Sequence, residues 1–279
     1  MCSLTSQTED LAMSDHTVAP TKPASQATQI RLLTVRMLLK VMREPAVTIP
    51  NLAISVFFLF TYNGAFGSSD VTLIPGVGGN YLNFILPVTV LFSSISGGAA
   101  GLTLVADLET GYFRRQLSMP LSRSAIVLAA ILLGAIQVLV QATLILSLGL
   151  LMGADPAAGV GGALALLGFA LLWGMGFAGY SVATGLKTGN AQAAQAATFI
   201  FFPLMFLAPV FLPMEQLAGW IQAIAKVNPT TYMLEAMRSV MIQGWVASSL
   251  IKGLAAGGIF AAITLTAAVR VARSKTSRA

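Results

Sequence analysis

The chain has 279 residues, of which 56% are hydrophobic and only 9% are charged, and its mean hydropathy is +0.80. A soluble domain carries about a quarter charged residues on average, so this chain could not cover a water-facing globule of its size with polar groups. The composition therefore excludes an ordinary soluble protein and indicates an integral membrane protein.

The formal net charge of +6 raises the question of nucleic acid as a partner. The basic residues lie between apolar stretches and at both chain ends, so membrane topology explains them better, and no nucleic acid is expected. The single cysteine, Cys2, and the single histidine, His16, lie in the polar leader. A lone cysteine forms neither an intrachain disulfide nor a metal site. We therefore expect no catalytic residue, no metal and no bound cofactor.

Residues 1–28 are polar, rich in Ser, Thr, Ala and Pro, and lack the apolar core of a signal peptide. We predict a disordered cytoplasmic tail here. Met13 is an alternative start of translation.

Residues 30–44, IRLLTVRMLLKVMRE, have the spacing of an amphipathic helix that ends before Pro45. The apolar face is formed by Val35, Leu38, Leu39 and Met42, and the basic face by Arg36, Lys40 and Arg43. We predict that this helix lies on the cytoplasmic surface of the membrane. A solvated linker is the alternative.

Six stretches are long and apolar enough to cross a bilayer core of about 30 Å as helices. They cover about 47–66, 82–105, 124–152, 160–184, 193–212 and 250–269. With six spans and an internal N-terminus, all Lys and Arg residues except Lys226, Arg238 and Lys252 fall on the cytoplasmic side. Both termini are therefore expected in the cytoplasm.

No span carries an Asp, Glu, Lys or Arg well inside its apolar run. This counts against a proton- or sodium-coupled carrier, although backbone carbonyls can also bind sodium. Glycines recur instead, at Gly97 and Gly101 and at Gly174, Gly176 and Gly179. Such small-residue faces predict close helix packing.

Residues 107–123, DLETGYFRRQLSMPLSR, separate the second and third spans. Gly111 and Pro120 interrupt a short segment of mixed charge, and Ser122 is placed to cap the next helix. A short helix of this kind suits docking into a protein groove, but an ordinary loop has the same composition.

The external segment 213–249 is too long for a simple turn. Leu217, Trp220, Ile221 and Ile224 recur at helical spacing, and Asn228-Pro229 then marks a break. Residues 230–244 follow as a second short helix, in which Glu235 and Arg238 are expected to form a helix-surface pair. We predict two interfacial or re-entrant helices before the last span.

Two motifs at matching topological positions resemble those of the type-2 ABC export permeases, particularly the daunorubicin-resistance-like branch. They are ETGYFRRQLSMPLSR at 109–123 and NPTTYMLEAMR at 228–238, and the resemblance covers nearly the whole chain from about residue 30. It implies that residues 107–123 are similar to the coupling helix that contacts a nucleotide-binding subunit, and that residues 30–44 look like the connecting helix. The implied coupling residues are Glu109, Gly111, Tyr112, Phe113, Arg114, Arg115, Leu117 and Pro120, and the external motif residues are Asn228, Pro229, Glu235 and Arg238.

The predicted fold is thus an all-α integral membrane protein with six transmembrane helices, an amphipathic N-terminal interfacial helix, a cytoplasmic coupling helix and short external helices before the last span. The transmembrane domain is expected to cover 29–270, followed by a cytoplasmic tail at 271–279. The resemblance also implies a dimer, with a second identical copy or a paralogue, and a substrate route at the subunit interface.

The predicted function is the permease subunit of an exporter in a bacterial-type plasma membrane. The chain contains no G-x-x-x-x-G-K-[ST] loop, so ATP is expected on a separate cytoplasmic ATPase subunit. An uncharged pathway favours a hydrophobic or amphipathic cargo, either drug-like or a lipid or lipid-linked glycan. An ion-coupled carrier or channel and a membrane-embedded enzyme are the competing interpretations. Polar residues that could line a route are Gln137, Gln141, Ser94 and Tyr180, for each of which an interhelical hydrogen bond is the alternative role.

Overall fold

The computed structural model describes residues 25–43, 48–67, 77, 79–109, 122–199 and 201–275. Within these ranges the chain forms helices and turns and contains no β-strand. In chain order the elements are α1 (Gln26–Arg43), α2 (Thr48–Phe66), α3 (Tyr81–Ser93), the 3₁₀ helix η3 (Ser94–Gly98), α4 (Ala99–Glu109), α6 (Arg123–Leu151), α7 (Gly159–Thr188), α8 (Ala191–Phe199), α9 (Phe201–Phe206), the 3₁₀ helix η4 (Met214–Gln216), α10 (Gly219–Val227), α11 (Pro229–Arg238), the π-helix η5 (Ser239–Gln243) and α12 (Ala247–Lys275).

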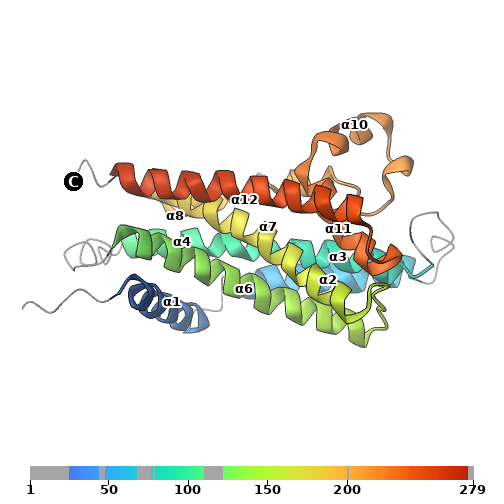
Figure 1. Ribbon diagram of the computed structural model, residues 1–279, viewed down its shortest axis with the longest axis horizontal. Helices are drawn as coiled ribbons and strands as arrows, with labels where there is room; N and C mark the ends of the chain where they lie inside the picture. Colours follow the sequence, from blue (N-terminus) through green and yellow to red (C-terminus); the bar gives the residue numbers. More distant parts are fainter. Residues whose placement is uncertain are drawn as a thin grey trace, which may run out of the picture.

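The helices form an elongated bundle in which α6, α7, α12 and the α3–η3–α4 span run along the long axis (Figure 1). Helix α1, the end of α4 and the C-terminal end of α12 lie at one end of the bundle, called here the α1 end. Helices α10 and α11 lie at the other, the α11 end. The two ends of the described chain thus lie on the same side, as an even number of membrane crossings requires.

Five helical stretches are long and apolar enough to cross a membrane. They are Thr48–Phe66, Tyr81–Asp107, Ser124–Leu151, Gly159–Thr188 and Ala247–Ser274. Each overlaps one of the predicted spans, which confirms the prediction of an all-α membrane protein. The remaining predicted span, 193–212, overlaps the shorter helices α8 and α9, beyond which the chain continues as turns and bends from Leu207. A total of six crossings stays a prediction.

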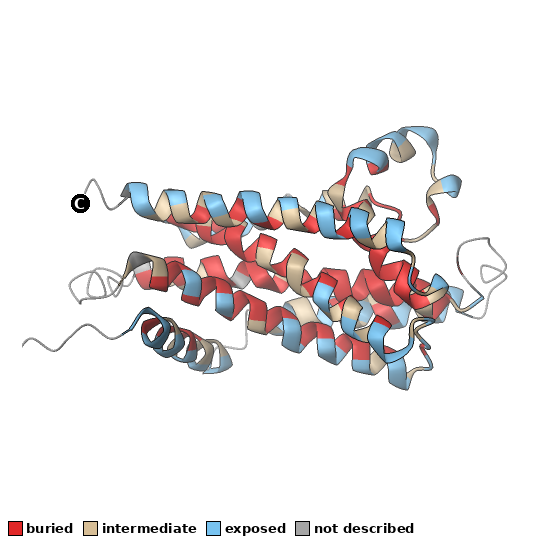
Figure 2. Ribbon diagram, in the orientation of Figure 1, coloured by how far each residue is buried: buried red, intermediate tan, exposed pale blue. Residues whose placement is uncertain are grey.

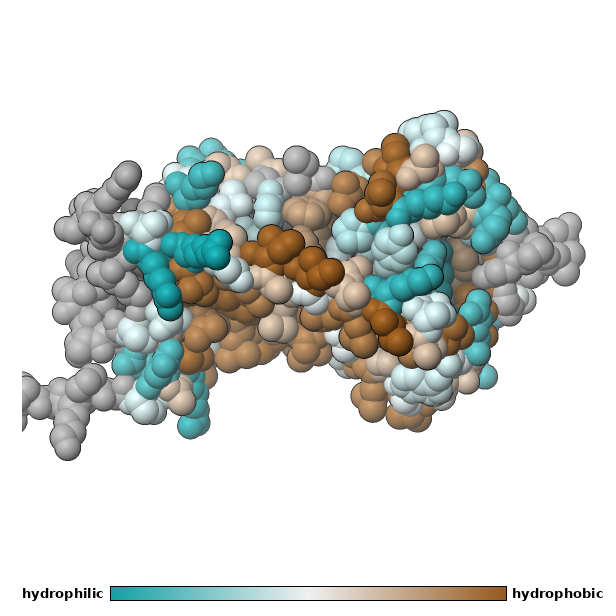
Figure 3. All heavy atoms as spheres, turned by 45° about the horizontal axis from the view of Figure 1, so that its top comes forward, coloured by the Kyte–Doolittle hydropathy of each residue, from teal (hydrophilic) through white to brown (hydrophobic). Residues whose placement is uncertain are grey.

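The bundle has a buried centre and exposed margins (Figure 2). The span Tyr81–Asp107 is almost entirely covered by its neighbours, whereas α2 and α12 expose most of their length. Their outward side chains are large and apolar, such as Phe57 and Phe60 on α2 and Ile263 on α12. On the face seen in Figure 3, apolar side chains form a middle zone between polar groups that gather at both ends. Such a surface suits a bilayer core flanked by headgroups.

Glycine allows α7 to approach the central span closely. A side chain at Gly97 would collide with the carbonyl oxygen of Gly174, and one at Gly101 would collide with Ser181. The Ser181 hydroxyl donates across this contact to the carbonyl oxygen of Gly98, at 2.5 Å. The predicted small-residue faces therefore serve helix packing, and backbone contact replaces the side-chain layer found in larger interfaces.

Candidate functional site

Helix α1 packs against the bundle through a face that the sequence pattern did not single out. Gln29, Leu33 and Met37 are buried at i, i+4 and i+8, whereas Val35 and Met42 of the predicted apolar face are exposed. Leu39 of that face is exposed as well. The helix therefore has two apolar sides, one held by protein and the other turned outward, as expected for a helix between a bundle and lipid.

The basic face of α1 binds a carboxylate at the end of the central span. Both terminal nitrogens of Arg36 donate to the carboxylate of Asp107, at 3.2 and 3.3 Å, and Lys40 Nζ lies 3.2 Å from Oδ1. The Asp107 side chain is only 3% exposed, and those of Arg36 and Lys40 are 34% and 29% exposed. A nearly buried carboxylate needs such partners, because losing water without compensation is costly. This ion-pair cluster therefore fixes α1 to the last turn of α4.

Two glutamines of α1 bind the start of α6 in a similar way. The side-chain oxygen of Gln29 accepts a hydrogen bond from the backbone N–H of Ser122, at 2.9 Å, and Gln26 Nε2 donates to the Ser124 hydroxyl, at 3.2 Å. Helix α1 thereby joins the end of α4 to the start of α6, which are the two ends of the predicted coupling segment. We call this set of contacts the α1 junction; its members are Gln26, Gln29, Arg36, Lys40, Asp107, Ser122 and Ser124.

Most of the predicted coupling residues lie outside the described residues. Glu109 is the last residue of α4, and Gly111, Tyr112, Phe113, Arg114, Arg115, Leu117 and Pro120 fall in the undescribed stretch 110–121. Ser122 is placed as expected, because its hydroxyl caps α6 by accepting a hydrogen bond from the N–H of Ala125, at 3.3 Å. The structure thus shows how the segment is held at both ends, and the roles of its residues stay a prediction.

At the opposite end, α11 is largely buried rather than lying on a surface. Asn228 caps the helix by accepting from the N–H of Thr230, at 3.0 Å, and Pro229 occupies the first helical position. The Asn228 side-chain amide also donates to the carbonyl oxygen of Leu204, at 2.6 Å. The predicted break at Asn228-Pro229 is therefore confirmed, and it also anchors α11 to the end of α9.

The predicted helix-surface pair of Glu235 and Arg238 is wrong, because Arg238 is buried. Its side chain is buried and donates to three carbonyl oxygens, from Nε to Phe84 at 3.1 Å, from one terminal nitrogen to Val210 at 2.6 Å, and from the other to Pro209. Its guanidinium also lies over the Phe84 ring, 3.5 Å from the ring centre. The pair spacing on the helix was read correctly, but the tertiary fold turns Arg238 inward, where the carbonyls of Pro209 and Val210, which lie outside any helix, need donors.

The charge of Arg238 is retained at neutral pH. Burial lowers the pKa of Arg238 to about 9, while Tyr81 and, to a smaller extent, Glu235 oppose that shift. The site is therefore a cation held by backbone dipoles. We call Asn228 and Arg238 together the α11 clamp, because they hold the chain from Leu204 to Val210 from both ends of α11.

Two of the four predicted route residues, Ser94 and Tyr180, make contacts with neighbouring helices. The Ser94 hydroxyl donates to the carbonyl oxygen of Ala170, at 3.0 Å, so it has the alternative role of an interhelical hydrogen bond. Tyr180 is partly buried and packs edge-on against Phe201, with ring centres 4.9 Å apart.

Gln137 and Gln141, in contrast, are buried with unused hydrogen-bonding capacity. They are 5% and 1% exposed. Gln137 Nε2 lies 3.5 Å from the Thr48 hydroxyl. The side-chain oxygen of Gln137 and both amide atoms of Gln141 have no hydrogen-bond partner among the described residues. Buried amide groups without partners are rare, because each costs about 1–3 kcal/mol. This pair is the least satisfied polar feature in the described part of the membrane core.

Among the described residues, no group of three or more His, Cys, Asp and Glu side chains could hold a metal ion. The α1 junction and the α11 clamp are instead mechanical attachments in a helical membrane protein. The structure is thus that of a polytopic membrane protein in which both sets of polar contacts hold helices in position.

The chain belongs to the ABC-2 type transporter family, whose model matches residues 28–242. It is 26% identical over 216 residues to the daunorubicin resistance ABC transporter permease protein DrrB1 of Streptomyces coeruleorubidus, covering 75% of this chain and 74% of the relative. It is 24% identical over 242 residues to a protein of Mycobacterium tuberculosis that is named as a doxorubicin resistance ABC transporter permease, DrrC, covering 84% and 87%. A protein of Porphyra purpurea named as a transport permease, ycf38, is 26% identical over 215 residues, covering 76% and 73%. The predicted family resemblance is confirmed, and the chain is a transporter permease.

Proposed function

We propose that this permease is the membrane-spanning subunit of an ATP-driven exporter that moves a hydrophobic or amphipathic, drug-like molecule out of the cell. A separate cytoplasmic ATPase would supply the energy. The α1 junction carries the proposal, because it joins both ends of the segment that resembles a coupling helix to a helix suited to the membrane surface. A displacement of that segment would be transmitted to α1, α4 and α6 together.

The packing contacts support a route by which a displacement of the predicted coupling segment would reach the membrane spans. Asp107 lies two residues before the end of α4, so a displacement of residues 110–121 acts directly on the central span. That span packs by backbone contact on α7, and α7 packs along α12. Close packing transmits rigid-body movement better than it absorbs it. Movement at the α1 end would therefore reorient several spans at once, as switching between inward- and outward-facing states requires.

The amide pair Gln137 and Gln141 is the best candidate for a contact with cargo. Thr48, at the start of α2, is the neighbour of Gln137, and α2 has few contacts with α6. Displacement of α2 would open the side of Gln137 that faces Thr48 to a molecule entering the bundle, and Gln141 lies one turn further along the same helix. Amides recognise hydroxyl and carbonyl groups without requiring charge, which suits an amphipathic, drug-like cargo. The names of the relatives, which refer to daunorubicin and doxorubicin, support this class of cargo.

We further propose two permease copies in each exporter, identical or paralogous, in a bacterial-type plasma membrane with both termini in the cytoplasm. The exposed apolar faces of α2 and α12 offer surface for a second copy as well as for lipid. Export of a lipid or lipid-linked glycan is the second candidate within the same architecture, because such molecules would also cross an uncharged route.

Co-purification of the full-length chain with a candidate ATPase, followed by ATP hydrolysis measurements, tests the proposal. We expect a stable complex in which Glu109→Ala changes the hydrolysis rate several-fold while the permease still inserts and folds. Glu215→Ala is the matched control, because Glu215 is an exposed carboxylate at the α11 end and should leave the rate unchanged. Transport by the chain alone, driven by an ion gradient, would contradict the proposal and identify a carrier.

A further inference from the structure

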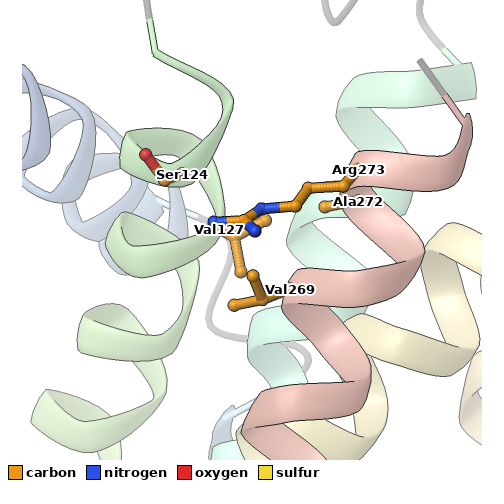
Figure 4. A pocket seen from close by; sticks show the side chains of 5 residues that line it. All are labelled: Ser124, Val127, Val269, Ala272 and Arg273. Carbon is orange, nitrogen blue, oxygen red and sulfur yellow. The ribbon is translucent and has the colours of Figure 1, made fainter. Parts of the chain in front are cut away.

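A small groove opens between the start of α6 and the end of α12, at the α1 end of the bundle. It has a volume of about 240 Å³ and is lined by Ser124, Val127, Val269, Ala272 and Arg273. In Figure 4 the Arg273 side chain extends from α12 toward α6, so that its guanidinium lies close to Val127. We call this hollow the α6–α12 groove.

The groove lies where two membrane spans meet the membrane surface. Ser124 begins the apolar stretch of α6, and Arg273 is the last residue but one of the apolar stretch of α12. Val127 and Val269 lie one turn further into the membrane from these two residues. The polar groups of the groove are therefore at headgroup level, and its apolar walls are at the level of the first methylene groups of the lipid chains.

The polar side of the groove can bind an anion. The guanidinium of Arg273 is an exposed cation with planar donors that match phosphate oxygens. The Ser124 oxygen already accepts a hydrogen bond from Gln26, at 3.2 Å, which leaves its own O–H to donate. A second exposed cation, Arg270, lies one helical turn earlier on α12 and adds to the positive potential.

We propose that the α6–α12 groove binds an anionic phospholipid, with its phosphate at Arg273 and Ser124 and the start of an acyl chain between Val127 and Val269. The volume supports part of a lipid rather than a whole ligand, because sites for drug-sized molecules usually occupy about 300–1,000 Å³. The rest of the acyl chain would continue into the bilayer. Basic pockets between spans at a membrane surface are a known way of holding acidic headgroups.

The position of the groove connects lipid binding to the α1 junction. Ser124 would contact the lipid and Gln26 at once, and Gln26 belongs to the helix that binds Asp107 through Arg36 and Lys40. A phosphate bound at Ser124 and Arg273 would add a contact between α6 and α12, next to the contact between α6 and α1. This inference rests on the fold and on the charge of the groove, and it does not depend on the identity of the cargo or of the ATPase.

Native mass spectrometry of the full-length permease in detergent, titrated with phosphatidylglycerol or phosphatidylcholine, tests the proposal. We expect tighter binding of phosphatidylglycerol, weakened about tenfold by Arg273→Gln, as expected for the loss of a charge-assisted pair. Arg270→Gln is the matched control and should weaken binding by no more than about twofold, because Arg270 does not line the groove. Val127→Phe, which fills the apolar wall, should also weaken binding while leaving every charge in place.

Two further measurements keep the outcomes distinct. Arg273→Lys keeps the positive charge but loses the planar donors, so it should bind the lipid less tightly than the wild type and more tightly than Arg273→Gln. Binding by Arg273→Lys no tighter than by Arg273→Gln would contradict a role for the charge at this position. Soluble glycerol phosphate should not displace the lipid at equal concentration, and displacement by it would show a phosphate site without a lipid component. Equal losses for Arg273→Gln and Arg270→Gln would overturn the proposal, since they would show only general attraction to a basic surface.

Discussion

The two ends of the bundle are fastened by chemically different contacts. At the α1 end, Asp107 is bound by the side chains of Arg36 and Lys40, both of which remain about one-third exposed. At the α11 end, Arg238 is buried and donates to the backbone carbonyls of Phe84, Pro209 and Val210. Partly exposed ion pairs are weakened by salt and can exchange partners, whereas a buried cation among carbonyls has no alternative partner. We therefore expect the contacts at the α1 end to be displaced more easily than those at the α11 end.

The largest effect is expected from breaking the fixed end. Arg238→Met should destabilise the protein by about 3 kcal/mol or more, because it removes the side-chain donors from the buried carbonyls of Pro209 and Val210, which lie outside any helix, and from that of Phe84. Thermal unfolding in detergent, followed by size-exclusion chromatography, measures the loss. Arg270→Met removes an exposed arginine and is the control. Unfolding of both variants at the wild-type temperature would show that Arg238 is not a structural anchor.

A smaller and salt-dependent effect is expected at the α1 end. A double-mutant cycle with Asp107→Asn and Arg36→Gln should give a coupling energy of about 1 kcal/mol, since the arginine is partly solvated. Stability measured at low and high salt should show the coupling shrink as salt rises. Arg238→Met should show no such salt dependence. A coupling energy between Asp107 and Arg36 that does not change with salt would contradict the proposed difference between the two ends.

The smallest effect concerns Glu235, next to the clamp. Burial raises the pKa of Glu235 above its ordinary value of 4.5, although Lys252 and Arg238 oppose the shift. The folded protein then binds this proton more tightly than the unfolded chain, so stability falls as the pH rises from about 4.5 through the raised pKa. Glu235→Gln should remove that loss and raise the melting temperature by about 2 °C at pH 7 but not at pH 4. Glu215→Gln, on an exposed side chain, should shift it at neither pH.

Local patterns predicted the elements well because their causes are local. Long uncharged runs correctly predicted five of the spans. Ser122 predicted the cap of α6, and Asn228-Pro229 predicted the start of α11. Each of these depends on residues that are neighbours in the sequence. The same holds for Gly97 and Gly101, whose spacing indicated a packing face.

The attachments could not be predicted because they join residues that are distant in sequence. Asp107 and Arg36 are separated by 71 positions, and Arg238 and Phe84 by 154. One signal was present for the first: Arg36 and Lys40 share a helix face at i, i+4 and could bind one carboxylate. For Arg238 the partners are backbone carbonyls, which leave no mark in the sequence. Composition alone does not show where a helix ends, so the crossing predicted at 193–212, which α8 and α9 overlap, stays a prediction.

One span, Tyr81–Asp107, connects both kinds of attachment, and its middle is the 3₁₀ helix Ser94–Gly98. Phe84, under the clamp, lies on one side of that stretch, and Asp107, at the junction, lies on the other. A 3₁₀ helix has fewer residues per turn and a longer rise than an α-helix, so rewinding these five residues as α-helix would shorten the span by about 2.5 Å and rotate one half against the other by about 100°. Rewinding of Ser94–Gly98 would therefore couple a rotation of the half of the span attached to α1 to its approach toward the half attached to the clamp.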